Sequence, residues 1–426
     1  MRTSFFNLYL LAVLLSYSNL SSAYLDPGTG NALIYLILSA FGAGVFYLRR
    51  IFYKFIGLLR KENSGSSKNV IEITIFSEGK TYWFTFKPII EELLSRKINF
   101  RYLSTDIEDP ALTISSPFMH SRYVGEGQKA YAKIGRSEGK VFLSTTPNIG
   151  CKGYPLRRPK RVDKMVHIYH SVNDLSYYKQ GSLDNYDVVI DIGKWCEPRL
   201  REVEKIRHLK PKKWLAAGLP YLDELSKNVV LKKDVSNPIC VLVAPSWGDK
   251  NSLKVHGTDF LFRLLNNNFS VILRPHPQSW HFEKEFYDSL LLECNNFENF
   301  NLDTKVDGRF SMEKSDILIS DSSSFRFDFA FLYKKPVITL QVPTSDLSSY
   351  EAALLGGPWE KNIVHKLGTV IKKGESIDIC NVIRNLVLNN RKETIDVINN
   401  LYDEIIVNHG RSAQVIVDYI VNEGLN

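Results

Sequence analysis

Cysteine is scarce in this chain of 426 residues, and its five thiols form no CxxC pair and no Cys/His cluster with zinc spacing. They lie far apart, at Cys151, Cys196, Cys240, Cys294 and Cys380. An odd number of widely spaced cysteines excludes a disulfide framework as the basis of the fold. It is typical of thiols in a reducing compartment.

The common nucleotide motifs are also missing. No GxGxxG follows the first predicted strand and no GxxxxGK[ST] occurs, so a nicotinamide or P-loop site has no support. No Asp-x-Asp occurs either, which removes the commonest sequence sign of a metal-bridged sugar nucleotide. We therefore expect no cofactor and assign no metal ligands, and the sequence leaves a metal requirement open.

Composition and charge set broad limits. With 44% apolar residues the chain can bury two or three domain cores, so disorder is not expected. A formal charge of +8 favours an acidic partner, but it suits nucleic acid, anionic lipid and phosphorylated substrates alike.

The N-terminal 60 residues predict a membrane anchor. Residues 5–17 form an apolar run that is either a cleaved signal or a first membrane helix. Residues 31–48 carry no charge, just span a bilayer, and end at Arg49 and Arg50, which should stay in the cytoplasm. In both cases the globular part faces the cytoplasm from the inner membrane. The polar segment 61–69 reads as a flexible tether.

From residue 70 onward, short apolar runs alternate with longer segments of helical period. The predicted strands are 70–76, 98–103, 141–144, 165–169 and 187–192, then 239–244, 270–273, 316–319 and 337–340. A polar break at 226–238 separates the two series. The pattern predicts an α/β chain with two Rossmann-like lobes, 70–230 and 231–426, and an active site in a central cleft between them.

Small polar residues follow the strand at 316–319. Ser320, Asp321, Ser322, Ser323 and Ser324 stand at a strand-to-helix junction, where free N–H groups and the helix dipole attract an anion. A plain helix cap with spare serines is the alternative, because Ser and Asp are favoured caps. We predict a phosphate site here.

A second strand end carries Arg274 and His276, the latter between two prolines that stiffen the loop. His276 can stabilise charge on a phosphate oxygen during transfer, unless it is a loop histidine bonded to backbone. Arg274 can reach the same phosphate or pair with a neighbouring carboxylate.

In the first series, His170 lies at the carboxyl end of the strand 165–169 and is our candidate general base. Asn173 or Asp174 is expected to orient it, and both are candidates for lining the cleft. A satisfied structural histidine is the competing account. By alternation, only the end residue, and not His167, should project into the cleft. Ser246 and Trp247 end another strand and are candidates for lining the cleft, although an aromatic there is more often packing.

Together these segments resemble the CDP-glycerol glycerophosphotransferase family, which includes teichoic acid glycerol-phosphate primases and polymerases. The matching pieces are His170, Gly218-Leu219-Pro220 with Asp223-Glu224-Leu225, Ala244-Pro245-Ser246-Trp247, Arg274-Pro275-His276-Pro277, Ser320-Asp321-Ser322-Ser323-Ser324 with Phe327-Asp328-Phe329, and Lys335-Pro336-Val337-Ile338. The order of the pieces is more specific than any one of them.

The resemblance implies a GT-B-like fold and transfer of a polyol phosphate from a CDP-linked donor to a glycan or lipid-linked glycan acceptor, with release of CMP. It implies that His170 is the base, that His276 contacts the donor phosphates and that the serine segment holds them. Membrane is an expected partner and nucleic acid is not.

Two departures keep other functions open. Tyr169-His170-Ser171 stands where the family usually has Trp-His-Gly, and Ser322 stands where its phosphate loop commonly has tyrosine. One alternative is a GT-B glycosyltransferase that uses a CMP- or UDP-sugar. Another is a non-catalytic protein of envelope assembly.

Overall fold

The computed structural model describes residues 71–232, 234–305, 307–343 and 346–425. The predicted membrane segments 5–17 and 31–48 and the tether 61–69 lie outside these residues. Within the described ranges, no helix has the length and apolarity needed to cross a membrane. Both sheets belong to one compact unit, Ser66–Asn426.

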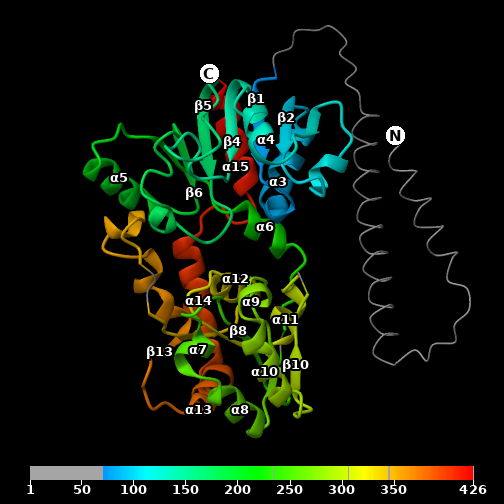
Figure 1. Cartoon of the computed structure of the whole chain (residues 1–426), viewed down its shortest axis with the longest axis vertical. Coiled ribbons are helices and arrows are strands. Elements are labelled where there is room, and N and C mark those ends of the chain that lie inside the picture. Colours follow the sequence, from blue (N-terminus) through cyan, green and yellow to red (C-terminus); the bar gives the residue numbers. More distant parts are fainter. Residues whose placement is uncertain (1–70, 233, 306, 344–345, 426) are drawn as a thin grey trace, which may run out of the picture. The chain divides into compact units, whose positions relative to one another are not determined.

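The first sheet has seven parallel strands in the order β3-β2-β1-β4-β5-β6-β7 (Figure 1). Their bounds are β1 Ile73–Ser77, β2 Phe100–Ser104, β3 Met119–Tyr123, β4 Glu138–Ser144, β5 Arg161–Ile168, β6 Val188–Asp191 and β7 Lys213–Ala216. The register pairs Ile73 with both Phe100 and Val141, which places β1 between β2 and β4. Every pair is parallel, so each pair of consecutive strands is joined by a crossover connection.

The second sheet has six parallel strands in the order β10-β9-β8-β11-β12-β13. Their bounds are β8 Cys240–Ala244, β9 Ser270–Leu273, β10 Phe300–Leu302, β11 Ile317–Ser320, β12 Val337–Leu340 and β13 Gly368–Ile371. The central strands β8, β11 and β12 are buried at every residue, as expected for a sheet covered by helices on both faces.

Each predicted strand corresponds to a strand of the structure, with shifts of zero to four residues at its ends. Four strands fall outside the predicted ranges, β3, β7, β10 and β13, and all four lie at sheet edges. An edge strand is half solvated and lacks a continuous apolar run, and β10 has only three residues, of which two are exposed. The two-sheet α/β prediction is confirmed.

Helices occupy most of the connections between the strands. The α-helices are α3 Trp83–Ser95, α4 Gly127–Ile134, α5 Cys196–Ile206, α6 Pro220–Ser226, α7 Ser252–His256, α8 Asp259–Asn266, α9 Ser279–Phe282, α10 Lys284–Cys294, α11 Arg309–Lys314, α12 Phe325–Tyr333, α13 Ile379–Arg384, α14 Arg391–Ile405 and α15 Ser412–Tyr419. Helix α3 shows the typical pattern, because Phe86, Ile89, Ile90 and Leu93 recur at helical spacing and are all buried.

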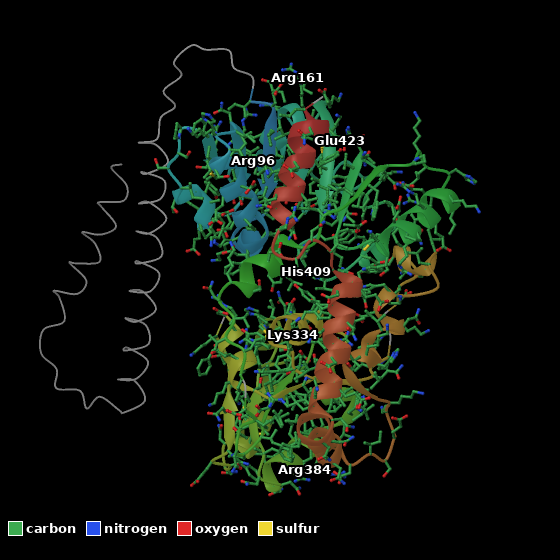
Figure 2. All side chains as sticks on the ribbon, turned by 180° about the vertical axis from the view of Figure 1, so that it is seen from behind. Arg96, Arg161, Lys334, Arg384, His409 and Glu423 are labelled. Carbon is green, nitrogen blue, oxygen red and sulfur yellow. The ribbon has the colours of Figure 1, made fainter. Side chains whose placement is uncertain are left out.

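The last helix returns to the first sheet. Ile416, Val417 and Ile420 pack in the same apolar cluster as the strand residues of β1 and the α3 residues. Arg96, just after α3, pairs with Asp418 of α15 at 2.6 Å, and Figure 2 shows α15 lying along the first sheet. The predicted lobe 231–426 is therefore corrected at its C-terminal end, since α15 completes the first lobe.

The two lobes are in direct contact. Tyr221 of α6 donates a hydrogen bond to Asp328 of α12 over 3.1 Å. Trp359 stacks between Trp195 of the first lobe and Phe327 of the second, with ring centroids 4.5 and 5.0 Å away. One apolar cluster runs through both lobes, so their relative placement is fixed by packing.

Candidate active site

Ser320 and Asp321 hold two strand ends of the second sheet together. The Ser320 hydroxyl donates to the carbonyl of Ala244 at 2.6 Å. The buried Asp321 carboxylate accepts the N–H groups of Ser246, at 3.0 and 3.1 Å, and of Ser252, at 2.7 Å. Their polar groups are therefore used inside the protein, and a carboxylate repels phosphate. The prediction that these two residues bind donor phosphate is corrected to a supporting role.

The next three serines are more open. Ser322 and Ser324 are exposed at the start of α12, and Ser323 accepts the N–H of Phe325 at 3.3 Å. The positive end of the helix dipole points here, together with the N–H groups of the first turn. These serines, on the nine-residue helix α12, remain candidates for a phosphate site.

Arg326, which follows this serine segment, is a buried cation that sequence reasoning missed. Its Nε donates to the Ser323 carbonyl at 2.9 Å and its Nη2 pairs with Glu360 at 2.9 Å. Only 2% of the side chain is exposed. Arg326 therefore fixes the serine loop. The sequence does contain a sign of this role, because Arg326 is a charged residue within the apolar run of α12. Arginine is rarely buried unless it is paired in this way.

Arg274 is paired within the second lobe. Its Nη1 lies 2.6 Å from Asp303, a residue just beyond β10. Gly308 lies against the guanidinium, and a Cβ there would come within 3.0 Å of Nε. Of the two roles predicted for Arg274, the structure shows the carboxylate pair.

His276 is held in one orientation by its neighbours. Its Nδ1 accepts the N–H of Gln278 at 3.2 Å, so the neutral ring carries its proton on Nε2. Burial lowers the pKa of His276, which favours this neutral form. The ring stacks on Trp247, with centroids 6.3 Å apart. The arrangement presents an N–H donor rather than a fixed positive charge.

Glu283 ties the loops after β8 and β9 to each other. It accepts the N–H of Gly248 at 3.0 Å and the hydroxyl of Ser279 at 2.7 Å, and pairs with Lys254 at 2.9 Å. Trp247, which is 49% exposed, stacks on Phe282 and on His276. Ser246 and Trp247, both predicted to line the cleft, therefore have different roles. Ser246 holds Asp321 through its backbone, whereas Trp247 supports His276 at the surface.

His170 lies two residues beyond β5, next to Tyr82. The edge of one ring faces the other, with centroids 5.0 Å apart and planes at 89°. Its Nδ1 is buried, with no hydrogen-bond partner among the residues that the structure describes. Burial lowers the pKa of His170 to about 4. His167, in contrast, is fully buried and bonds through Nε2 to the Tyr178 hydroxyl at 3.0 Å, as expected for a histidine of the sheet interior.

Asn173 and Asp174 do not orient His170. The Asp174 carboxylate accepts the N–H of Ser176 at 2.9 Å and pairs with Arg199. Asn173 accepts the N–H of Asp174 at 2.8 Å. Both side chains therefore cap the turn that follows the strand, and their predicted role as partners of His170 is wrong.

This geometry predicts the cost of breaking the Asp174 pair. Asp174 is fully buried, so Arg199→Ala would leave a carboxylate without its cation and should destabilise the protein by about 3 kcal/mol. Urea unfolding followed by circular dichroism measures this. A change within error would show that the pair contributes nothing.

The carboxyl edges of the two sheets meet close to these residues. Tyr82 of the 3-10 turn Lys80–Tyr82 contacts His170, and two residues later Phe84 lies under the guanidinium of Arg309, 5.5 Å from the ring centroid. Arg309 follows Gly308, which contacts Arg274. These contacts connect the end of β5 in the first lobe with the end of β9 in the second. Ligand sites of open α/β sheets lie at such strand ends.

Comparisons with known proteins identify the family of this chain. The family model described as CDP-Glycerol:Poly(glycerophosphate) glycerophosphotransferase matches residues 200–422, just over half of the chain. The chain belongs to this family. It is therefore an enzyme of the glycerophosphotransferase class, as predicted. The matched region includes His276 and the serine segment but not His170.

Solved structures share the fold. The wall teichoic acid polymerase TagF, as a variant, has 18% identity and a TM-score of 0.51, and the match covers 91% of this chain and 98% of that one. The UDP-GlcNAc 2-epimerase from Neisseria meningitidis, bound to UDP-GlcNAc, has 13% identity and a TM-score of 0.53, covering 82% and 99%. A glycosyltransferase from Rickettsia africae has 13% identity and a TM-score of 0.50, covering 83% and 100%. The GT-B-like fold is confirmed.

A search of curated protein sequences finds no match.

Proposed function

We propose that the protein transfers a polyol phosphate, glycerol phosphate or a similar group, from a CDP-linked donor to an acceptor hydroxyl in cell-envelope polysaccharide synthesis. One observation carries the donor side. His276 has its Nδ1 occupied by the Gln278 N–H, so the neutral ring offers Nε2–H as a donor, and it lies with the serines at the start of α12 in the region that matches the family. Glu283 and Asp321, the second of which precedes these serines, act electrostatically on His276 and support a common site.

In the proposed reaction, His170 takes the proton of the acceptor hydroxyl and the oxygen attacks the distal phosphorus of the donor. The bond from that phosphorus to the bridging oxygen breaks, and its electron pair leaves with CMP. Nε2–H of His276 and the N–H groups at Ser322 to Ser324 stabilise this charge. Arg274 enters only as a supporting cation, because Asp303 already neutralises it.

The protonation of His170 predicts a distinctive pH dependence. The base must be neutral, and it is neutral above its pKa, which burial lowers to about 4. For free enzyme, kcat/KM should therefore stay level from pH 7 to 5 and fall only below that range. Donor phosphates raise the pKa of a nearby imidazole, so the acid limb of kcat should lie at higher pH than that of kcat/KM.

Steady-state rates of CMP release between pH 4 and 8 test this prediction. Enzyme held at each pH and returned to pH 7 serves as the control for unfolding. If kcat and kcat/KM both began to fall with acid near pH 6.5, the result would contradict a buried neutral base.

A donor screen tests the reaction itself. The full chain in detergent should release nucleotide from CDP-glycerol or another CDP-linked polyol, with transfer to a glycan or lipid-linked glycan acceptor. CMP-sugars and UDP-sugars should give no turnover above background. Release from sugar nucleotides alone would overturn the proposal.

A GT-B glycosyltransferase is the second candidate. It is favoured by the shared fold with the Rickettsia africae glycosyltransferase and with the epimerase bound to UDP-GlcNAc. In that case the serine loop would hold the diphosphate of a UDP- or CMP-sugar. The same screen separates the two, because turnover with one donor class excludes the other as the main substrate.

We also propose that residues 1–60 anchor the enzyme at the inner membrane, with the catalytic part in the cytoplasm. The support is the apolar, uncharged run 31–48 followed by Arg49 and Arg50. The full chain should remain in the membrane fraction after a wash in high salt, and a chain without residues 1–60 should not. Retention of the shortened chain in that fraction would contradict the anchor.

A further inference from the structure

A cavity of about 300 Å³ lies in the second lobe, at the edge of the sheet opposite the serine segment. Its lining includes Asp316 and Pro336, which directly precede β11 and β12. The serine segment begins at the other end of β11, and in a parallel sheet the amino and carboxyl ends of the strands lie at opposite edges. The cavity is therefore separate from the candidate active site. Its volume is at the lower end of the range for small-molecule sites.

Positive charge dominates the lining of this cavity. Its charged members are four cations and one carboxylate, namely Lys232, Lys334, Lys335, Arg391 and Asp316. The Asp316 carboxylate is already held by Lys232 at 2.9 Å and by the Cys240 N–H at 2.9 Å. A surplus of positive charge in a partly enclosed space attracts an anion.

Two of the four cations have no hydrogen-bond donors to spare. The Lys335 ammonium donates over 2.6 to 2.9 Å to three backbone carbonyls, those of Met312, Glu313 and Ser315. Because an ammonium has three N–H groups, Lys335 can offer a ligand its charge but no donor. Lys232 likewise makes three hydrogen bonds within the protein, one of them to Asp316.

Lys334 and Arg391 keep donors for a ligand. Among the residues that the structure describes, neither side chain forms an ion pair. The Lys334 ammonium lies over the Tyr402 ring, 3.9 Å from its centroid, and Figure 2 shows Lys334 beside α14. A ring face occupies only part of an ammonium. Arg391 donates through Nη2 to the Lys232 carbonyl at 3.2 Å, which leaves most of its five N–H groups.

Two further features favour an anion beside these donors. Burial lowers the pKa of Lys334 to about 8, and a bound anion would stabilise the charged ammonium. Arg391 is also the first residue of the fifteen-residue helix α14, whose positive dipole end lies there.

Apolar side chains make up much of the remaining wall. They come from the segment between α6 and β8, from the residues before β12 and from the end of the chain that includes α14, and they are Leu231, Val235, Tyr333, Pro336, Val387 and Ile395. A ligand that fills the cavity therefore has an apolar body beside its charged group.

We propose that this cavity binds a phosphate monoester with an apolar body. At pH 7 such a group carries close to two negative charges, so it offsets more of the positive surplus than a carboxylate does. Its oxygens accept hydrogen bonds from the Lys334 ammonium and the Arg391 guanidinium. Nothing in this inference depends on the reaction proposed above.

The position of the cavity gives the ligand a consequence for the whole molecule. Both connections between the lobes pass it, since Leu231 lies between α6 and β8 and α14 leads to α15 of the first lobe. Helix α12 runs from the serine segment to Lys334. A bound ligand ties these elements together at one point, so we expect it to slow local opening of α14.

The test titrates phenyl phosphate into the full chain in detergent at pH 7, followed by isothermal titration calorimetry. Lys334→Gln and Arg391→Gln should each raise the Kd about 10- to 100-fold, the scale of one hydrogen bond between charged groups. Inorganic phosphate, which lacks the ring, should bind at least about 10-fold more weakly than phenyl phosphate. Equal Kd values for wild type and both variants would overturn the proposal.

Matched variants separate the site from net charge and from folding. Lys392→Gln removes the same charge from the next residue of α14, which is exposed and does not line the cavity. Its Kd should stay within about twofold of wild type, and a loss equal to that of Lys334→Gln would show a general charge effect and refute the site. Lys334→Arg keeps the cation and should bind almost as wild type does.

Hydrogen exchange locates the bound probe. Phenyl phosphate should slow amide exchange in the first two turns of α14 in wild type, and should not do so in Lys334→Gln. Slower exchange only around Ser322 to Ser324 would place the probe at the serine segment and contradict the proposal. Neither measurement uses turnover, so failure of the transfer reaction would leave both results valid.

Competition distinguishes the two sources of this chemistry, because phosphate monoesters occur as soluble metabolites and as the headgroup of phosphatidic acid. Dioctanoyl phosphatidic acid is added to the detergent, with dioctanoyl phosphatidylcholine as its control. Displacement of phenyl phosphate by phosphatidic acid alone supports a lipid ligand, and displacement by neither lipid supports a soluble one. Displacement by both would show that the cavity does not select phosphate monoesters, against the proposal.

Discussion

His276→Ala should lower kcat for CMP release by about two to three orders of magnitude, the loss seen when one preorganised donor to a developing oxyanion is removed. The orientation of His276 explains the size of the effect. The Gln278 N–H fixes Nδ1 and Trp247 supports the ring, so Nε2–H is aimed before the substrate arrives. Acceptor KM should change little, because His276 lies in the lobe that we propose to bind the donor.

Two further substitutions identify what His276 contributes. His276→Gln retains an N–H donor near the position of Nε2 and should recover part of the rate, whereas a role as a cation would allow no such recovery. His281→Ala removes an exposed histidine from the neighbouring helix α9 and should leave kcat within about twofold of wild type. Near-normal turnover of His276→Ala would refute the role of His276.

His170→Ala should lower kcat about 10²- to 10⁴-fold, the usual contribution of a positioned general base. Because His170 lies in the first lobe, the KM for the CDP-linked donor should remain close to the wild-type value. Added imidazole should restore part of the activity through the space left by the ring. The measurement is transfer to a glycerol phosphate oligomer that ends in glycerol, followed together with CMP release.

His120→Ala is the matched control for this variant. His120 is an exposed histidine of the same sheet, on edge strand β3, and its loss should not change kcat. If His170→Ala transfers at the wild-type rate, another group takes the acceptor proton.

Strand-end reasoning selected most of the candidate site residues, and burial explains where it failed. His170, His276 and Ser322 to Ser324 were selected because polar residues stop apolar runs at one edge of each sheet, and their roles stay predictions. Asn173 and Asp174 were misassigned, since sequence does not reveal that Arg199, on a helix more than twenty residues later, takes the Asp174 carboxylate. Which carboxylate a cation pairs with depends on tertiary packing, as Arg274 and Asp303 also show.

Because α15 packs on α3 and belongs to the apolar cluster of the first sheet, the first lobe cannot be finished until almost the whole polypeptide has left the ribosome. Isolated residues 70–230 would lack Ile416, Val417 and Ile420 and would leave part of this cluster open to water, at a cost of roughly 1.5 to 3 kcal/mol for each side chain that becomes fully exposed. The first part to be synthesised is therefore the last to be completed, and nascent chains that stall before residue 412 should bind chaperones.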